Sequence, residues 1–151
     1  MSEFEKLAEH SLQLDRQLCF PLYAASRLMT RRYKPYLDKL GITYPQYLVL
    51  MVLWQQDALA VKMIGEKLYL SSNTLTPLLK RLAALQLIER KRGVDDEREM
   101  YIYLTESGQA LQQKALCVLA PFAQGSEQDK LKLQQLKGQL ELLLEQLANE
   151  E

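Results

Sequence analysis

The stretch from Leu70 to Leu104 constrains the fold most, because its hydrophobic period changes once along its length. In the first half the large apolar residues are Leu75, Leu78, Leu79 and Leu82, at the i, i+3, i+4 and i+7 spacing of a helix with one buried stripe. After Gln86 the pattern becomes that of two short strands, Leu87–Arg90 and Met100–Leu104. We therefore predict an amphipathic helix followed by a two-stranded ribbon.

The face of this helix opposite the leucines is polar, basic and small, with Asn73, Thr76, Pro77, Lys80, Arg81 and Ala84. Such a face suits a DNA groove better than a protein core. Ser71 or Ser72 would cap the helix, and Pro77 would lie early enough that its missing amide costs little. Residues 61–69 predict a shorter preceding helix with Met63, Ile64 and Leu68 facing inward. Two helices, a tight turn and a charged ribbon are the winged variant of the helix-turn-helix.

The candidate DNA-binding residues are Ser71, Ser72, Asn73, Thr74, Thr76, Lys80, Arg81, Arg90, Arg92, Asp96 and Arg98. Those on the helix would face a major groove, some touching phosphates and others base edges. The loop Lys91–Glu99 would project Arg92 and Arg98, and Arg98 would reach an adjacent minor groove while Asp96 steers it by an ion pair. The alternative is that these basic residues form only a solvated helix face and the ribbon an ordinary hairpin.

The overall charge neither supports nor excludes a nucleic-acid partner. The 151 residues carry a formal net charge of zero, but basic groups concentrate at Lys80, Arg81, Arg90, Lys91 and Arg92, and a neutral protein can bind DNA through one basic surface. A hydrophobic content of 48% is that of a soluble globular protein. The longest apolar run, Tyr47–Trp54, is too short to span a bilayer. The acidic N-terminus has no apolar targeting segment, so we expect a cytoplasmic protein that does not enter membranes.

The rest of the chain is expected to be helical. After a lead-in over residues 1–12, the apolar series from Leu14 to Leu40 predicts one helix of more than twenty residues that Gly41 ends, although Pro21 could instead mark its start. Thr43 and Pro45 would open a second, central helix. Thr105 would cap a fifth helix that runs to about Leu119, and Ser126 would cap the last one.

The last helix predicts an oligomer. Its stripe of leucines, Leu133, Leu136, Leu140, Leu143, Leu144 and Leu147, has no obvious partner within the chain. We assign this stripe, together with the first helix, to a homodimer interface. The expected fold is thus mainly α with a small two-stranded wing: a single chain 1–151, with a DNA-binding part at 43–104 and helical dimerisation parts at 11–41 and 105–151.

Cys19 and Cys117 are the only cysteines and form no CxxC pattern, and His10 is the only histidine. We therefore expect no metal site and no cofactor. If one helix carries Cys19 and Tyr33, then Cys19, Tyr23, Ser26, Thr30 and Tyr33 fall within about 40° of one line at ~100° per residue. Hydroxyl donors beside a thiol stabilise the thiolate, the form that attacks peroxides. Taken alone, however, these residues favour a small buried thiol among tyrosines that pack an interface.

Geometry limits which tyrosines could serve the thiol. Tyr23 is one turn from Cys19. Tyr33 is about 21 Å further along the same helix at ~1.5 Å per residue, and could meet Cys19 only if the first helices of two subunits packed antiparallel.

Several segments resemble the MarR family of bacterial transcriptional regulators: Leu70–Leu82, Gly93–Arg98 and Tyr103–Gly108. Upstream, Leu18–Arg27 and Ile42–Tyr47 resemble its organic hydroperoxide-sensing branch, the OhrR type. The resemblance covers about residues 14–120. It implies a homodimer, not an enzyme, that binds a pseudo-palindromic double-stranded DNA operator, represses a peroxidase gene and is released when an organic hydroperoxide oxidises it.

The resemblance also implies roles for single residues. Cys19 would sense the oxidant, and Tyr23, Tyr33 and Tyr44 would support the thiol, the last two from the other subunit. In the two-cysteine subtype a sulfenic acid condenses with a second cysteine of the partner, which Cys117 would supply. Two alternatives stay open. One is a MarR-type repressor released by a non-covalent ligand, and the other is a thiol peroxidase, for which there is no thioredoxin-like pattern and only Arg16 near Cys19.

Overall fold

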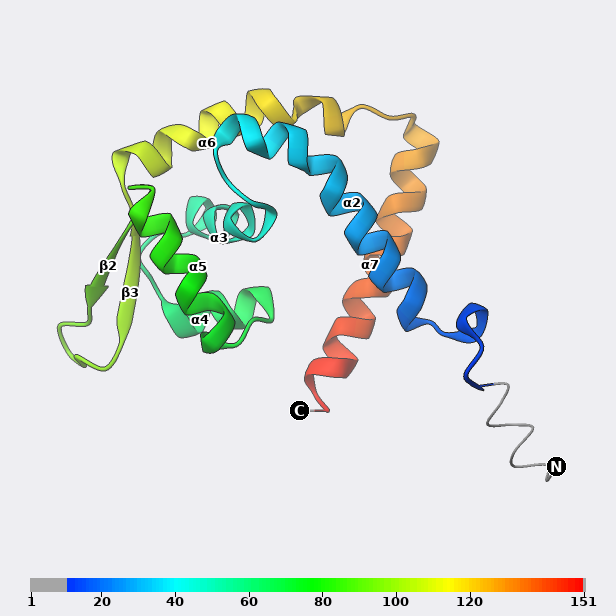
Figure 1. Ribbon diagram of the computed structural model, residues 1–151, viewed down its shortest axis with the longest axis horizontal. Coiled ribbons are helices and arrows are strands. Elements are labelled where there is room, and N and C mark those ends of the chain that lie inside the picture. The colour runs from blue at the N-terminus through cyan, green and yellow to red at the C-terminus, as the bar shows by residue number, and fades with distance from the viewer. Residues whose placement is uncertain (1–10, 151) are drawn as a thin grey trace. The chain divides into compact units, whose positions relative to one another are not determined.

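The computed structural model describes residues 11–150, so His10 and most of the expected lead-in lie outside the described residues. The chain divides into two compact units, the first ending at Ala115 and the second beginning at Leu116. Figure 1 labels the main helices and strands of both.

The first unit holds a helical cluster and a small sheet. Its elements are η1 (Leu14–Arg16), α2 (Cys19–Leu40), α3 (Tyr44–Gln55), β1 (Leu59–Ala60), α4 (Val61–Leu68), α5 (Ser72–Ala84), β2 (Ile88–Arg92) and β3 (Met100–Leu104). Helix α6 (Glu106–Leu119) begins in this unit and ends in the second, which also holds η2 (Ala120–Ala123) and α7 (Glu127–Ala148). The mainly helical fold with a small wing is therefore confirmed.

Helix α2 begins later than predicted. Leu14–Arg16 form a separate 3-10 turn, Gln17 is extended, and the α-helix starts at Cys19. Proline has no amide hydrogen, so Pro21 cannot donate to the carbonyl of Gln17, and this missing bond favours a helix that begins just before Pro21, where no donor is needed. The single helix from Leu14 was wrong, and the alternative that Pro21 marks the start was right. Cys19 thus becomes the first residue of α2.

The connection between α2 and α3 follows the local signals in the sequence. Gly41 ends α2 in the left-handed region, with φ of 70°, where glycine meets no steric penalty. Thr43 then caps α3 in a reciprocal capping box: its hydroxyl accepts from the amide of Gln46, whose side chain accepts from the amide of Thr43 at 2.8 Å. Val49, Leu50 and Leu53 are buried, which confirms that α3 is central.

Helices α4 and α5 form the helix-turn-helix. Ile64 is buried, but Met63 is 44% exposed, so its inward placement was wrong. With only eight residues in α4, its inner face is narrow and is filled by Ile64 and Gly65. The predicted stripe of α5 is confirmed, since Leu75, Leu78, Leu79 and Leu82 are all buried.

One expectation for α5 was wrong. Pro77 is the sixth residue of the helix, beyond the first turn, so it leaves the carbonyl of Asn73 without its usual donor. Ser71 is the N-terminal cap residue, but its hydroxyl bonds Thr74 Oγ1 at 3.2 Å rather than a backbone amide.

The sheet has three strands in the order β1-β3-β2, all antiparallel, one more than predicted. The third is β1, which pairs Leu59 with Ile102. Strand β2 pairs with β3 from Ile88↔Leu104 to Arg92↔Met100, so the first predicted strand started one residue too early and ended two too soon. Lys91 and Arg92 consequently lie on the strand, because each residue of the five-residue β3 finds a backbone partner on β2.

The core of the first unit joins all these elements. Residues with almost no exposed surface come from α2, α3, α4, α5, β2 and β3, namely Leu37, Val49, Leu50, Leu53, Ile64, Leu75, Leu79, Leu82, Ile88 and Ile102. A hydrogen bond connects α3 to α6: the indole N–H of Trp54 donates to the carbonyl of Gly108 at 2.9 Å. The leucine stripe of α5 is therefore buried within the core.

Helix α7 begins at the predicted cap, where the hydroxyl of Ser126 accepts from the amide of Asp129 at 3.1 Å. Four leucines of its stripe are exposed: Leu133, Leu136, Leu144 and Leu147. None of the helices within residues 11–150 is both long and apolar enough to cross a membrane.

Candidate DNA-reading face and thiol site

The outer face of α5 carries the predicted polar and basic groups. Asn73, Thr74, Lys80 and Arg81 are exposed, while Thr76 is partly buried. The leucine stripe of the same helix is buried, so packing fixes which side of α5 faces solvent. The exposed face thus combines hydrogen-bonding side chains with two cations, the mixture that can contact both phosphates and base edges.

The wing loop after β2 holds its charged groups in place through internal contacts. Arg98 Nε lies 3.5 Å from Asp96 Oδ1, and the backbone amide of Arg98 donates to the same oxygen at 2.9 Å. This agrees with the predicted ion pair. The Arg98 side chain is 94% exposed, whereas the Arg92 guanidinium is turned back and donates to the carbonyl of Glu97 at 2.9 Å. Arg98 is therefore the wing cation best placed to reach a ligand.

Arg90 differs from the other predicted DNA-binding residues. It lies on β2 opposite Ile102, is partly buried, and its Nε is a buried donor without a hydrogen-bond partner among the described residues. Nearby, Lys91 Nζ lies 5.1 Å from the centre of the Tyr103 ring. A hydrogen bond to Glu99, together with the charge of that carboxylate, raises the pKa of Tyr101.

Four aromatic rings from α2 and α3 form one cluster. The ring centre of Tyr33 lies 5.4 Å from that of Tyr44 and 6.3 Å from that of Tyr47, and the Tyr47 ring lies 6.2 Å from Trp54. Burial, and then the neighbouring Tyr33, raise the pKa of Tyr44; the pKa of Tyr47 is raised by burial and by both tyrosines. The raised pKa values extend to higher pH the range in which the hydroxyls of Tyr44 and Tyr47 are protonated and can act as donors.

Cys19 is an exposed free thiol at the start of α2. One turn on, Tyr23 is 62% exposed, and the Arg27 guanidinium lies 5.2 Å from its ring centre. Thr30, expected on the same face, donates its hydroxyl to the backbone carbonyls of Ser26 and Arg27, so that hydroxyl serves its own helix. Tyr33 contacts Tyr44 within the chain, about 21 Å along α2 from Cys19 at ~1.5 Å per residue.

Cys117 is the second exposed free thiol and lies near the end of α6, in the second unit. The sequence analysis assigned no role to Tyr47 or Trp54, although both belong to the apolar run and Tyr47 also ends the segment Ile42–Tyr47. Tyr47 follows Tyr44 by three residues and Trp54 follows Tyr47 by seven, and this helical spacing could have indicated one aromatic face of α3.

Comparisons with known proteins identify the family. Residues 31–115 match the model described as transcriptional regulator SarA/Rot. The chain is 53% identical over 136 residues to the organic hydroperoxide resistance transcriptional regulator of Bacillus subtilis (strain 168), covering 90% of this chain and 92% of that protein.

Solved structures of AbfR, a protein of Staphylococcus epidermidis, share the fold. Reduced AbfR bound to DNA is 37% identical, with a TM-score of 0.75 over 91% of this chain and 99% of that one. AbfR in its disulfide form is 35% identical, with a TM-score of 0.66 over 96% and 99%. The chain belongs to the MarR/SarA family of DNA-binding transcriptional regulators, within the branch of organic hydroperoxide resistance regulators.

Proposed function

We propose that this protein is a homodimeric repressor that releases its operator when an organic hydroperoxide oxidises Cys19. The observation that carries the proposal is the position of the free Cys19 thiol at the first residue of α2, where a helix favours an anionic group, in a chain 53% identical to an organic hydroperoxide resistance regulator.

The chemistry at Cys19 is a two-electron oxidation. The thiolate sulfur attacks the distal oxygen of the hydroperoxide, an S–O bond forms and the O–O bond breaks. Sulfur becomes a sulfenic acid, and the leaving alkoxide takes a proton to become an alcohol. The N-terminal end of a helix favours anionic groups, and protonated tyrosines can donate hydrogen bonds to the thiolate or to the leaving oxygen.

In the proposed dimer, Tyr23 supports the thiol from its own helix, and Tyr33 and Tyr44 support it from the other subunit. Their mutual contact at one end of α2, with Cys19 at the other, fits two α2 helices that run antiparallel. Large apolar side chains on α2, among them Leu18, Phe20, Leu28 and Met29, are exposed in the single chain. Covering this surface in a dimer would bring substantial hydrophobic stabilisation.

Cys117 would resolve the sulfenic acid. Its thiol attacks the Cys19 sulfur of the partner subunit, an S–S bond replaces the S–O bond, and water leaves. Both thiols are free and exposed in the single chain. AbfR supports this step by analogy, since that protein has been solved in a disulfide form.

The output is a change in the distance between two reading helices. We assign DNA binding to residues 43–104 and dimerisation to 11–41 and 105–151. The reading residues are Ser71, Ser72, Asn73, Thr74, Thr76, Lys80 and Arg81 on or beside α5, with Arg90, Arg92, Asp96 and Arg98 on the wing. A dimer reads two half-sites about one helical turn apart, so a shift of a few ångströms at the interface lowers affinity without unfolding the protein.

A gel-shift experiment tests the proposal. The probe is a duplex selected from a random-sequence pool by the reduced protein. Cumene hydroperoxide should release wild-type protein and dithiothreitol should restore binding, whereas Cys19→Ser should remain bound. If Cys19→Ser is released as readily as wild type, oxidation of this thiol is not the trigger. Release by a non-oxidising ligand instead would support the non-covalent alternative.

A further inference from the structure

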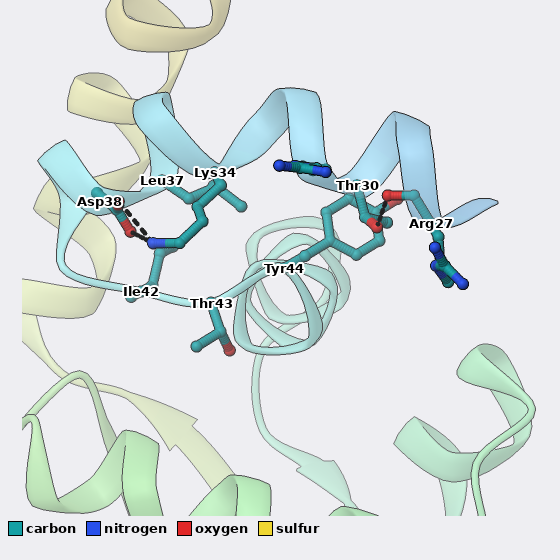
Figure 2. Close-up of a pocket in the computed structure, with 9 residues that line it drawn as sticks. Arg27, Thr30, Lys34, Leu37, Asp38, Ile42, Thr43 and Tyr44 are labelled. Carbon is teal, nitrogen blue, oxygen red and sulfur yellow. Dashed lines mark hydrogen bonds and ion pairs between the residues drawn. The ribbon is translucent and has the colours of Figure 1, made fainter. Parts of the chain in front are cut away.

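Two connections join the DNA-binding part, residues 43–104, to the helices that we assign to the dimer. The first leads from α2 into α3, and Figure 2 shows it passing through Ile42 and Thr43 to Tyr44, beside a pocket between the two helices. The second leads from β3 into α6 through Thr105. This second connection is hydrogen-bonded directly to the end of the reading helix α5.

The end of α5 is a closed turn. Gln86 has a left-handed backbone with φ of 58°, and its amide donates to the carbonyl of Ala83 at 2.9 Å. The next amide, that of Leu87, donates to the carbonyl of Leu82 at 3.2 Å. These two bonds form the Schellman arrangement, which closes the last turn of a helix. The backbone of Gln86 and Leu87 is therefore held as an extension of α5.

Thr105 binds this turn through its backbone and its side chain. Its amide donates to the carbonyl of Leu87 at 3.1 Å, and its hydroxyl donates to the carbonyl of Gln86 at 2.6 Å. The same hydroxyl accepts from the amide of Gly108 at 3.0 Å, so it also caps α6. One residue thus joins the first turn of α6 to the last turn of α5.

The contacts around Thr105 leave little freedom for the start of α6. A Cβ at Gly108 would lie 2.0 Å from the carbonyl oxygen of Leu87, so the two backbones are in close contact. The carbonyl of Gly108 also accepts the indole N–H of Trp54 at 2.9 Å. We call the set Gln86, Leu87, Thr105 and Gly108 the α5–α6 junction, and all of it lies within the first compact unit. Sliding or rotating α6 against α5 would break several of these contacts at once.

We propose that Thr105 is a positioning residue that passes a movement of α6 to the reading helix, because it holds the start of α6 and the end of α5 together as one rigid part. The inference rests on the proposed function, in which Cys117 forms a disulfide. Cys117 lies on the same helix as the junction, about three turns beyond its start. Hydrogen-bonded and closely packed elements of this kind can carry energetic coupling between distant sites. A loosely attached α6 would instead absorb the movement before it reached α5.

Two substitutions of Thr105 separate the contact with α5 from the capping of α6. Thr105→Asp keeps an acceptor for the amide of Gly108 and is an equally good cap, but an ionised carboxylate cannot donate to the carbonyl of Gln86. Thr105→Ser keeps both the donor and the acceptor and is the matched control. Fluorescence anisotropy at fixed salt gives the Kd of each protein for the selected duplex, reduced and after treatment with cumene hydroperoxide.

The readout is the factor by which oxidation weakens DNA binding. This factor should fall at least about threefold in Thr105→Asp, the range found when coupled residues are substituted, and should keep its wild-type value in Thr105→Ser. The added negative charge of Thr105→Asp acts in both redox states, so it cancels in the ratio. Non-reducing gels check that both variants form the disulfide to the same extent as the wild type.

A wild-type factor in Thr105→Asp would overturn the inference while leaving the proposed function intact. An equal loss in Thr105→Ser and Thr105→Asp would overturn it as well, because the serine hydroxyl can still bind α5. If oxidation does not weaken DNA binding by the wild-type protein, the proposed function itself fails, and the inference fails with it.

The fluorescence of Trp54 gives a second measurement that needs no substitution in the junction. Trp54 is the only tryptophan of the 151 residues, and its indole is bonded to Gly108. If the junction moves as one part, the emission maximum of the DNA-free protein should be the same before and after oxidation by cumene hydroperoxide. A red shift on oxidation would show that the indole loses its contact with α6, and would overturn the inference even where Thr105→Asp does not fold.

Discussion

At the scale of single residues, the thiol and its proposed supporting tyrosines are separated within one chain. Cys19 opens α2, whereas Tyr33 lies toward its other end and packs on Tyr44. Burial raises the pKa of the Tyr44 hydroxyl, so this hydroxyl stays protonated to a higher pH than that of a free tyrosine. A neutral hydroxyl can donate to a thiolate, which an ionised one could not.

The raised pKa of Tyr44 predicts a loss of stability in alkali. Below pH 10 the hydroxyl is protonated in both the folded and the unfolded chain. Above pH 10 the unfolded chain releases this proton first, so the free energy of unfolding falls as pH rises through the folded pKa. Tyr44→Phe should flatten this fall between pH 9.5 and 11 in urea titrations, and Tyr69→Phe, which removes an exposed hydroxyl, should not. An unchanged slope in Tyr44→Phe would contradict the account.

Removing the exposed wing cation Arg98 should lower the affinity for DNA. Arg98→Ala should weaken binding of the selected duplex by about 1–3 kcal/mol and relax any preference for A·T pairs beside the half-site. Asp96→Ala should have a smaller effect, because an exposed ion pair contributes only about 0–1 kcal/mol. Fluorescence anisotropy at fixed salt measures both, with Lys39→Ala on α2 as the control. If Arg98→Ala and Lys39→Ala bind equally well, Arg98 does not contact DNA.

At the scale of elements, local patterns predicted most of the fold. The spacing of Leu75 to Leu82, the cap at Thr43 and the left-handed Gly41 are all encoded within one or two turns of chain. Strand β1 was missed because its two residues are defined only by pairing with β3, more than forty residues away. The predicted burial of Met63 was wrong for the same reason, because distant parts of the chain decide which side of a short helix is covered.

Part of the candidate site could also be predicted from local sequence, and part could not. The exposed face of α5 follows from helical periodicity, so its residues could be named from the sequence. The contact of Tyr33 with Tyr44 requires two helices to be placed against each other. No spacing within α2 alone contains that information.

Substituting alanine for glycine should have opposite effects on stability at Gly108 in α6 and at Gly138 in α7. A Cβ at Gly108 would lie 2.0 Å from the carbonyl oxygen of Leu87, whereas one at Gly138 in α7 would meet nothing within 4 Å. Gly108→Ala should therefore destabilise the protein by about 3 kcal/mol or more. Gly138→Ala should stabilise it by about 0.5–1 kcal/mol, since alanine favours a helix interior.

Urea unfolding at one fixed protomer concentration compares these variants, because the stability of a dimer depends on concentration. A Gly108→Ala protein as stable as the wild type would show that the close approach of Leu87 to α6 is not maintained in solution.

At the scale of the whole molecule, the two thiols belong to different compact units, Cys19 to the first and Cys117 to the second. A disulfide between subunits would therefore link one subunit's first unit to the other's second unit. A disulfide requires the two α-carbons to come within about 7 Å, and any rearrangement needed to meet this limit would act on the dimer as a whole.

This proposal predicts a covalent dimer. After treatment with cumene hydroperoxide, the wild-type protein should migrate as a dimer on a non-reducing gel and as a monomer after dithiothreitol. Both Cys19→Ser and Cys117→Ser should remain monomeric, because each removes one end of the bond. A covalent dimer that persists in Cys117→Ser would refute the resolving role of that cysteine.

The central claim is that the redox state of Cys19 sets operator occupancy, and one titration tests it most directly. Cumene hydroperoxide is added in substoichiometric steps to reduced protein bound to the fluorescent duplex. Anisotropy reports occupancy, and mass spectrometry of quenched samples reports the fraction of Cys19 oxidised. We predict that occupancy falls in step with the loss of reduced Cys19 and recovers with dithiothreitol. Full occupancy with Cys19 oxidised, or release with Cys19 still reduced, would contradict the account.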